Sequence, residues 1–338
     1  LHGLSVRSNT RGTWDWSVAA SAYHYDNDEK RQNTTPLPGA ATGGAGTLAD
    51  GHGTGWTTLA ARGTWRPEGP QGAHIADFGV QQEAFHLKYQ TSLVPGNWIS
   101  DGPGNTASNI GGDTRLASLF AQDAWHFAPA WKSVLGGRLE HWTASGYTVI
   151  NSSTGTANLQ NSAWANRQET YLSPKAALSW QTRDNTLLKA SLGRAIRMPT
   201  VGELYGATST TNARYINDPT LRPERSWTGE LSVEQKLAAG QARLTYFAEN
   251  THDALYTQST LVPDNSGTNI SVSRVQNIGR IATQGLETAF SGEDVLLRGL
   301  DLQASLTYAN SVIKENAGFV AVAGDTLGKQ QPNIPHWR

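Results

Sequence analysis

The segment of the chain that says most about function is residues 194–230, whose charged side chains could do chemistry. The segment carries both charge signs, on Arg197, Arg222, Glu224, Arg225 and Glu230. Opposite charges on neighbouring strands can pair where lipid cannot reach them, and they can also bind a ligand. Pro199 and Pro223 hold the residues before them extended, which favours a long loop between two strands. Bracing of a protein wall is the interpretation that these charges favour.

The loop between Pro199 and Pro219 is the candidate ligand-contacting segment. It contains Tyr205, Arg214 and Tyr215. Phenol rings beside a guanidinium suit an anionic, aromatic ligand, because they combine apolar contact with charge-assisted hydrogen bonds. Decoration of an ordinary surface loop is the alternative role for each of the three.

Other kinds of site are disfavoured. The sequence has no G-x-S-x-G elbow, H-E-x-x-H run or phosphate-binding loop, so we expect no enzyme. Its nine histidines are scattered, with no pair at a helical metal spacing, and we expect neither a metal site nor a cofactor. The acidic run at residues 26–29 could hold a hard cation through its oxygens, although a solvated loop is the favoured interpretation.

Composition points to an unusual single domain. Only 16% of the 338 residues are charged, against roughly 25% in a typical soluble domain. Glycine (35) and tryptophan (12) are abundant, and no apolar run is long enough for a membrane helix. A net charge of −1 gives no basic surface for nucleic acid, and the absence of cysteine excludes disulfides and thiolate metal sites.

Apolar and polar residues alternate along the whole chain, which predicts half-buried β-strands. Residues 227–237 are typical, with Trp227, Leu231 and Val233 on one face and Glu230 and Glu234 on the other. Twelve strands are predicted, at 4–9, 14–25, 54–66, 73–87, 115–127, 131–147, 169–182, 186–194, 226–237, 241–252, 271–291 and 299–312.

The connections between these strands alternate between short turns and long loops. This is the pattern of a transmembrane, antiparallel, up-and-down β-barrel, an all-β fold with turns on the periplasmic side and loops outside. Several aromatic residues lie next to the predicted short turns, where a girdle at the lipid headgroups needs them. They are Trp65, Trp125, Phe127, Trp131 and Trp180.

Residues 194–230 resemble the paired "FRAP … EL" and "NPxLKPE … E" signatures of TonB-dependent outer-membrane receptors. The matching residues are Arg197, Pro199, Glu203, Leu204, Asn217, Pro219, Leu221, Pro223, Glu224 and Glu230. Residues 120–125 with 136–140, and 277–279 with 285–287, are similar to two further elements of the same family. We expect the motif residues to be structural.

The resemblance implies a central portion of a larger plugged barrel of about 22 strands, with residues 1–338 in the barrel domain and the plug and closing strands absent. It implies outer-membrane localisation, lipid contact, energy coupling through the TonB complex, and import of a metal chelate. Haem receptors of the family carry a ligand histidine between the two motifs, and residues 200–217 contain none. This absence disfavours haem, and because siderophores are the commonest ligands of the family, the resemblance implies a ferric siderophore. Cobalamin or another metal chelate, and an ungated diffusion porin, are the alternatives.

Overall fold

The computed structural model describes residues 1–151, 158–206, 208–209, 213–263, 269–316 and 326–338. Within these residues the chain forms seventeen β-strands, one short α-helix and one 3-10 turn, Gly39–Ala41. None of the helical segments described is long and apolar enough to cross a membrane. The elements are β1 (His2–Arg7), β2 (Trp14–His24), β3 (Glu29–Asn33), β4 (Gly46–Asp50), β5 (Gly55–Trp65), β6 (His74–Val94), β7 (Thr106–Ala128), β8 (Trp131–Asn151), β9 (Asn158–Ala163), β10 (Arg167–Arg183), β11 (Thr186–Arg197), α1 (Val201–Tyr205), β12 (Thr208–Ser209), β13 (Ala213–Ile216), β14 (Glu224–Leu237), β15 (Gly240–Pro263), β16 (Asn269–Gly292) and β17 (Leu302–Glu315).

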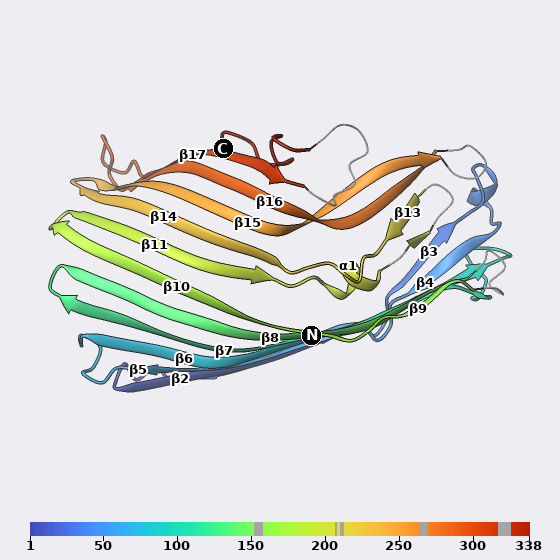
Figure 1. Cartoon of the computed structure of the whole chain (residues 1–338), viewed down its shortest axis with the longest axis horizontal. Coiled ribbons are helices and arrows are strands. Elements are labelled where there is room, and N and C mark those ends of the chain that lie inside the picture. The colour runs from blue at the N-terminus through green and yellow to red at the C-terminus, as the bar shows by residue number, and fades with distance from the viewer. Residues whose placement is uncertain (152–157, 207, 210–212, 264–268, 317–325) are drawn as a thin grey trace.

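Twelve of these strands make one antiparallel meander, and they are the twelve that the sequence predicts. Each pairs with the next, in the order β1, β2, β5, β6, β7, β8, β10, β11, β14, β15, β16 and β17. The result is a curved sheet (Figure 1), and among the described residues no pairing joins β1 to β17. The predicted up-and-down all-β topology is confirmed.

Several strands are longer than the sequence predicts. β15 and β16 have 24 residues each and pair over almost their full length, whereas a tilted crossing needs only about 9–11. β6, β7 and β8 are extended in the same way. The predicted loops also contain the short strands β3, β4, β9, β12 and β13, so the loop end of the sheet is a built structure.

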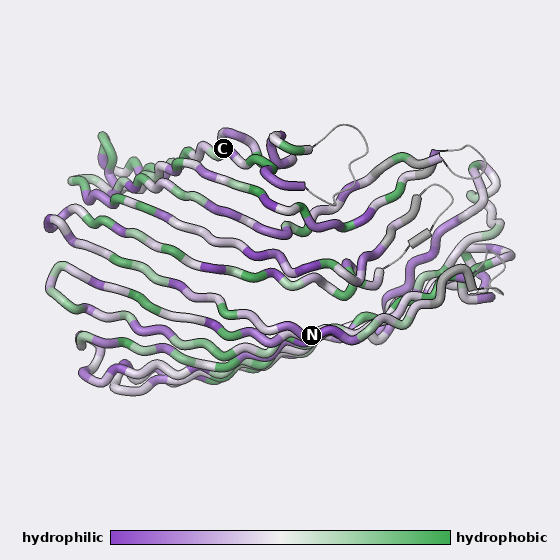
Figure 2. The backbone as a smooth tube through the Cα atoms, in the orientation of Figure 1, coloured by the Kyte–Doolittle hydropathy of each residue, from purple (hydrophilic) through white to green (hydrophobic). Residues whose placement is uncertain are grey.

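The two faces of the sheet differ in chemistry. One face, here called the outer face, exposes Leu119, Leu172 and Leu231 by 57%, 55% and 60%. The other, the inner face, carries polar and charged groups such as Asp77, which accepts hydrogen bonds from Thr64 Oγ1 (2.6 Å) and other side chains. Figure 2 shows the alternation of hydrophobic and hydrophilic residues along the strands.

Aromatic rings follow the short-turn edge of the outer face, as the sequence predicts. Trp131 and Trp180 stack with ring centroids 4.9 Å apart, and Phe127 lies 6.1 Å from Trp131. Trp14 and Trp65 stack at 5.9 Å, where β2 pairs with β5. Such a row suits the headgroup level of a membrane, because each ring has an apolar body and a polar edge.

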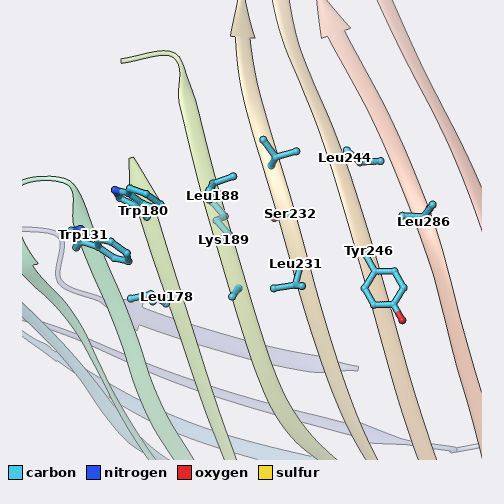
Figure 3. Close-up of a pocket in the computed structure, with 12 residues that line it drawn as sticks. Trp131, Leu178, Trp180, Leu188, Lys189, Leu231, Ser232, Leu244, Tyr246 and Leu286 are labelled. Atoms are coloured by element: carbon cyan, nitrogen blue, oxygen red, sulfur yellow. The ribbon is translucent and has the colours of Figure 1, made fainter. Parts of the chain in front are cut away.

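An apolar depression of about 460 Å³ lies on the outer face beside this row (Figure 3). Its lining includes Trp180, Leu188, Leu231, Leu244 and Leu286, which project from neighbouring strands of the sheet. It is a shallow part of the apolar band rather than a polar ligand site, because few polar groups border it.

Candidate functional site

The loop between β11 and β14 does not stand away from the sheet but folds onto its inner face. Helix α1 packs there against β7 and β8, and Figure 1 shows it beside β13 at the loop end of the molecule. Val201, Leu204 and Tyr205 are fully buried, in contact with the cluster that contains Trp142 of β8 and Ile110 of β7. The hydrophobic core nearest the motif is therefore made by the loop and the wall together.

Glycines make the space for this helix. A Cβ atom on Gly146 of β8 would overlap the ring of Tyr205, and a Cβ on Gly112 of β7 would lie 3.0 Å from Val201 Cγ1. The inner face is thus locally flat where α1 lies on it, as expected where glycine permits close approach of another segment.

The first motif half, residues 197–204, closes the start of the helix. Thr200 Oγ1 accepts a hydrogen bond from the Glu203 amide (3.3 Å), and the Glu203 carboxylate accepts one from the Thr200 amide (2.8 Å). This reciprocal capping box satisfies two amides that a helix start leaves free. Arg197 Nη2 donates to the same carboxylate at 2.7 Å. Pro199 is buried beside it.

The second motif half, residues 217–224, ties the loop to the helix and to β10. Asn217 Nδ2 donates to the Leu204 carbonyl at 2.8 Å. Arg167 of β10 donates to the carbonyl oxygens of Pro219 and Leu221, both at 2.9 Å. Leu221 and Pro223 are almost fully buried.

The loop returns to the wall at a charged junction centred on Asp253 of β15. Asp253 is 5% exposed, and its carboxylate accepts hydrogen bonds from Arg222 Nε (2.8 Å) and from Arg225. Asn277 of β16 accepts from the Arg222 amide (2.8 Å) and donates to the Asp253 carbonyl (2.7 Å). Glu224 accepts from the Leu255 amide at 3.0 Å. Arg222, Glu224 and Arg225 thus connect the end of the loop to β15 and β16.

A cavity of about 330 Å³ opens between α1 and the inner face, and we call it the loop pocket. Its lining residues are Leu87, Tyr89, Ile110, Thr200, Gly202, Glu203, Gly206 and Tyr215. Burial, with a further contribution from the Glu203 carboxylate, raises the pKa of Tyr215. Its phenol therefore stays neutral at physiological pH, able to donate a hydrogen bond.

An aromatic row continues from the pocket region along the inner face. The ring of Tyr23 stacks on that of Trp56 with centroids 4.3 Å apart, and Trp56 stacks on Phe85 at 6.4 Å. The three residues lie opposite one another on β2, β5 and β6. Phe85 and Leu87 both pack against the cluster under α1, which connects the row to the loop pocket.

The structure separates the three predicted ligand-contacting residues. Tyr215 lines the loop pocket. Tyr205 is 0% exposed, so in this conformation its ring offers no surface to a ligand and serves as packing instead. Arg214 lies in β13, but its side chain falls outside the described residues. Glu230 is exposed on β14, opposite Phe247 of β15, and takes no part in the loop.

Sequence reasoning missed Arg167, Asp253, Trp56 and Tyr89, which belong to other segments of the chain. Strand pairing brings them to the loop, and no local pattern marks them. Among the described residues no group of three or more histidine, cysteine, aspartate or glutamate side chains could hold a metal ion.

Comparison with known proteins gives a family match over nearly the whole chain. The family model described as "TonB dependent receptor-like, beta-barrel" matches residues 2–338. No curated protein sequence matches the chain.

Solved structures show the same fold at low identity. The chain is similar to the ferric yersiniabactin uptake receptor FyuA from Yersinia pestis (13% identity, TM-score 0.64, 99% of this chain and 45% of that one). It is also similar to the siderophore receptor PiuA from Acinetobacter baumannii (16%, 0.61, 99% and 50%). A third similar structure is the copper transporter OprC (16%, 0.63, 93% and 46%). The chain thus spans about half the length of these structures.

Proposed function

The chain belongs to the TonB-dependent receptor family, and from this premise we propose that the whole receptor imports a ferric siderophore. Members of the family are receptors and transporters of the bacterial outer membrane rather than enzymes. In this proposal, residues 1–338 form a central portion of the barrel, which surrounds a plug. TonB acts through that plug, on the short-turn side of the sheet.

The observation that carries the proposal is the loop pocket together with the aromatic row. A volume of about 330 Å³ lies within the range of small-molecule sites. Tyr89 and Tyr215 supply phenol groups, while Tyr23, Trp56 and Phe85 supply flat apolar faces. An iron chelate with aromatic or conjugated groups can stack on such faces and accept hydrogen bonds from the phenols.

The choice of an iron complex also draws on the similar structures. FyuA is named for ferric yersiniabactin, PiuA for a siderophore and FecA for ferric citrate, whereas OprC is named for copper. Cobalamin and other metal chelates are the competing ligands within the same class.

Fluorescence of the many tryptophans gives a direct binding test. The intact receptor in detergent is titrated with ferric siderophores of several chemical classes, the same siderophores without iron, and cobalamin. We expect saturable quenching by one ferric class. Trp56→Ala and Tyr215→Ala should each weaken it about tenfold, the loss of ~1.4 kcal/mol that one stacking or hydrogen-bonding contact can supply. Tyr246→Ala, on the outer face, is the matched control.

Three results would count against this proposal. Quenching by cobalamin alone would move the ligand to another chelate. Binding that is unchanged in both Trp56→Ala and Tyr215→Ala would remove the loop pocket and the row from the site. Steady ion conductance of the intact receptor in a planar bilayer would instead favour an ungated diffusion porin.

Transport is tested separately from binding. In cells, uptake of the quenching ligand should stop when TonB is deleted, while binding of that ligand to the cell surface continues. Uptake that persists without TonB would contradict energy coupling through this partner.

A further inference from the structure

Two histidines that are 28 positions apart in the sequence come together at the loop end of the outer wall. The rings of His24, the last residue of β2, and His52, in the turn before β5, have centroids 5.9 Å apart and planes at 87°. Backbone hydrogen bonds hold them there, because the Tyr25 amide donates to the Thr54 carbonyl (2.9 Å) and the Gly53 amide to the Tyr25 carbonyl (3.1 Å).

Each of the two rings is oriented by a contact between its own Nδ1 and Asp26. His52 Nδ1 lies 2.8 Å from the Asp26 carbonyl, which can only accept, so this nitrogen carries the proton. His24 Nδ1 lies 3.0 Å from the Asp26 carboxylate. A histidine that donates Nδ1–H to a carbonyl or carboxylate presents a basic Nε2, and this is the usual arrangement of histidines that bind metals.

The ring separation also fits joint coordination. With a metal ion about 2.0–2.1 Å from each Nε2, the two ring centroids would lie roughly 4.5 to 6.4 Å apart as the angle at the metal widens from about 90° to 180°, and the observed 5.9 Å lies within this range. The surrounding charges favour a cation, since Asp26 and Asp28 lie in the β2–β3 connection and Asp50, the last residue of β4, accepts from the His52 amide at 2.8 Å. The side chain of Lys88 passes beside Gly53, and its positive charge works against the attraction of these carboxylates for a cation.

From these contacts the geometry points to a two-histidine site, made by Nε2 of His24 and His52, for a divalent transition metal with water in the remaining positions. Imidazole ligands suit Cu²⁺, Ni²⁺ and Zn²⁺, with Cu²⁺ bound most tightly. His24 and Tyr23 are adjacent on β2, so their side chains point to opposite faces of the sheet. Tyr23 belongs to the inner aromatic row, and the two-histidine site therefore lies on the outer face, away from the loop pocket. A bound ion would cross-link the end of β2 to the turn before β5.

Copper titration of the intact receptor in detergent tests this site. We expect one Cu²⁺ whose electron paramagnetic resonance spectrum reports two nitrogen ligands. His24→Ala and His52→Ala should each weaken binding at least tenfold and remove the two-nitrogen signature. Asp26→Ala, which frees His24 Nδ1, should weaken it by about 10- to 100-fold, the usual effect of losing a partner that orients a metal ligand. His141→Ala, whose ring contacts Thr170, is the control.

Zinc provides an independent readout. Zn²⁺ should raise the melting temperature of the wild type and of His141→Ala, but not of His24→Ala or His52→Ala. Unchanged copper binding in both single variants would overturn the site. Displacement of Zn²⁺ by equimolar Ca²⁺ would also overturn it, because carboxylates rather than imidazoles would then hold the ion. Native gel mobility before heating checks that each variant is folded.

Discussion

Asp253 is the residue on which the return of the motif loop depends. It accepts from two arginines that come from the loop and β14, and it adopts a φ of 56° where the pairing of β15 with β16 is interrupted between His252 and Ala254 without a change of register. Aspartate and asparagine tolerate this left-handed conformation better than other residues with a side chain. Asp253→Asn therefore removes the charge and keeps the backbone.

We expect Asp253→Asn to destabilise the intact receptor by about 2 kcal/mol. A fully buried pair that loses one partner costs about 3–5 kcal/mol, but Arg222 and Arg225 are 65% and 43% exposed and regain water. Urea unfolding, followed by gel mobility, measures the change. Glu315→Gln, which breaks the exposed pair with Arg280, should cost less than 1 kcal/mol. Equal effects of the two substitutions would contradict the central role of Asp253.

Gly146 allows the Tyr205 ring to be buried against the inner face, and the sequence alone could not reveal this. Tyr205 and Tyr215 are equivalent as residues of one polar loop, and both were predicted to contact ligand. The flat inner face at Gly146 admits only the Tyr205 ring, which becomes core, whereas Tyr215 stays at the pocket. Such a distinction arises from long-range packing and leaves no local pattern.

The substitution Gly146→Ala should lift α1 from the wall. Its methyl group would overlap the Tyr205 ring, which is held by packing on several sides and cannot turn aside at low cost. We expect faster proteolysis between α1 and β14, and loss of ligand binding at the loop pocket. Gly137→Ala on the same strand has its nearest atom at 3.8 Å and should change neither property. Intact protection in Gly146→Ala would show that α1 does not depend on this contact.

At the scale of elements, α1 has five residues, and too few internal bonds to persist alone. Its start is fixed by Thr200 and Glu203, whose spacing in the sequence is that of a capping box. The helix itself was not predicted, because one turn gives no measurable apolar periodicity.

Removing the cap and removing the ion pair should have different effects. Thr200→Ala should cost α1 about 1 kcal/mol and accelerate hydrogen exchange at the Leu204 and Gly206 amides roughly fivefold. Glu203→Gln keeps an oxygen for the Thr200 amide and loses only the charge opposite Arg197, which is half exposed, so exchange should change less than twofold. Equal acceleration in the two variants would mean that the ion pair, not the cap, holds the helix.

The strands show where sequence patterns succeed and where they end. Within the crossing, lipid on one face and polar groups on the other enforce strict alternation, and all twelve strands were predicted. Beyond it, both faces meet water or loops, and the beginning of β7 reads Thr106-Ala-Ser-Asn-Ile-Gly-Gly. Because the two faces have the same surroundings there, polar and apolar residues do not alternate. The strand extensions and β13 were therefore predicted as loops.

At the scale of the whole molecule, the outer face is an apolar band bordered by the aromatic row at the short turns. This band accounts for low overall charge together with a negative mean hydropathy of −0.46, because each outward leucine is offset by an inward polar residue. The membrane is therefore part of the folding environment of the chain, and the exposed leucines are stabilising only in its presence.

Leu231 tests that dependence. It is 60% exposed near the middle of β14, on the outer face. An arginine at the bilayer midplane of a barrel costs about 2–4 kcal/mol, whereas alanine keeps the face apolar. We expect Leu231→Arg to lower the stability of the intact receptor in lipid vesicles by that amount, and Leu231→Ala by less than half as much. In urea titrations, the difference in the free energy of unfolding between the two variants measures the cost of the charge alone. If both variants unfold at the same urea concentration, β14 does not face lipid at this position, and the assignment of the two faces fails.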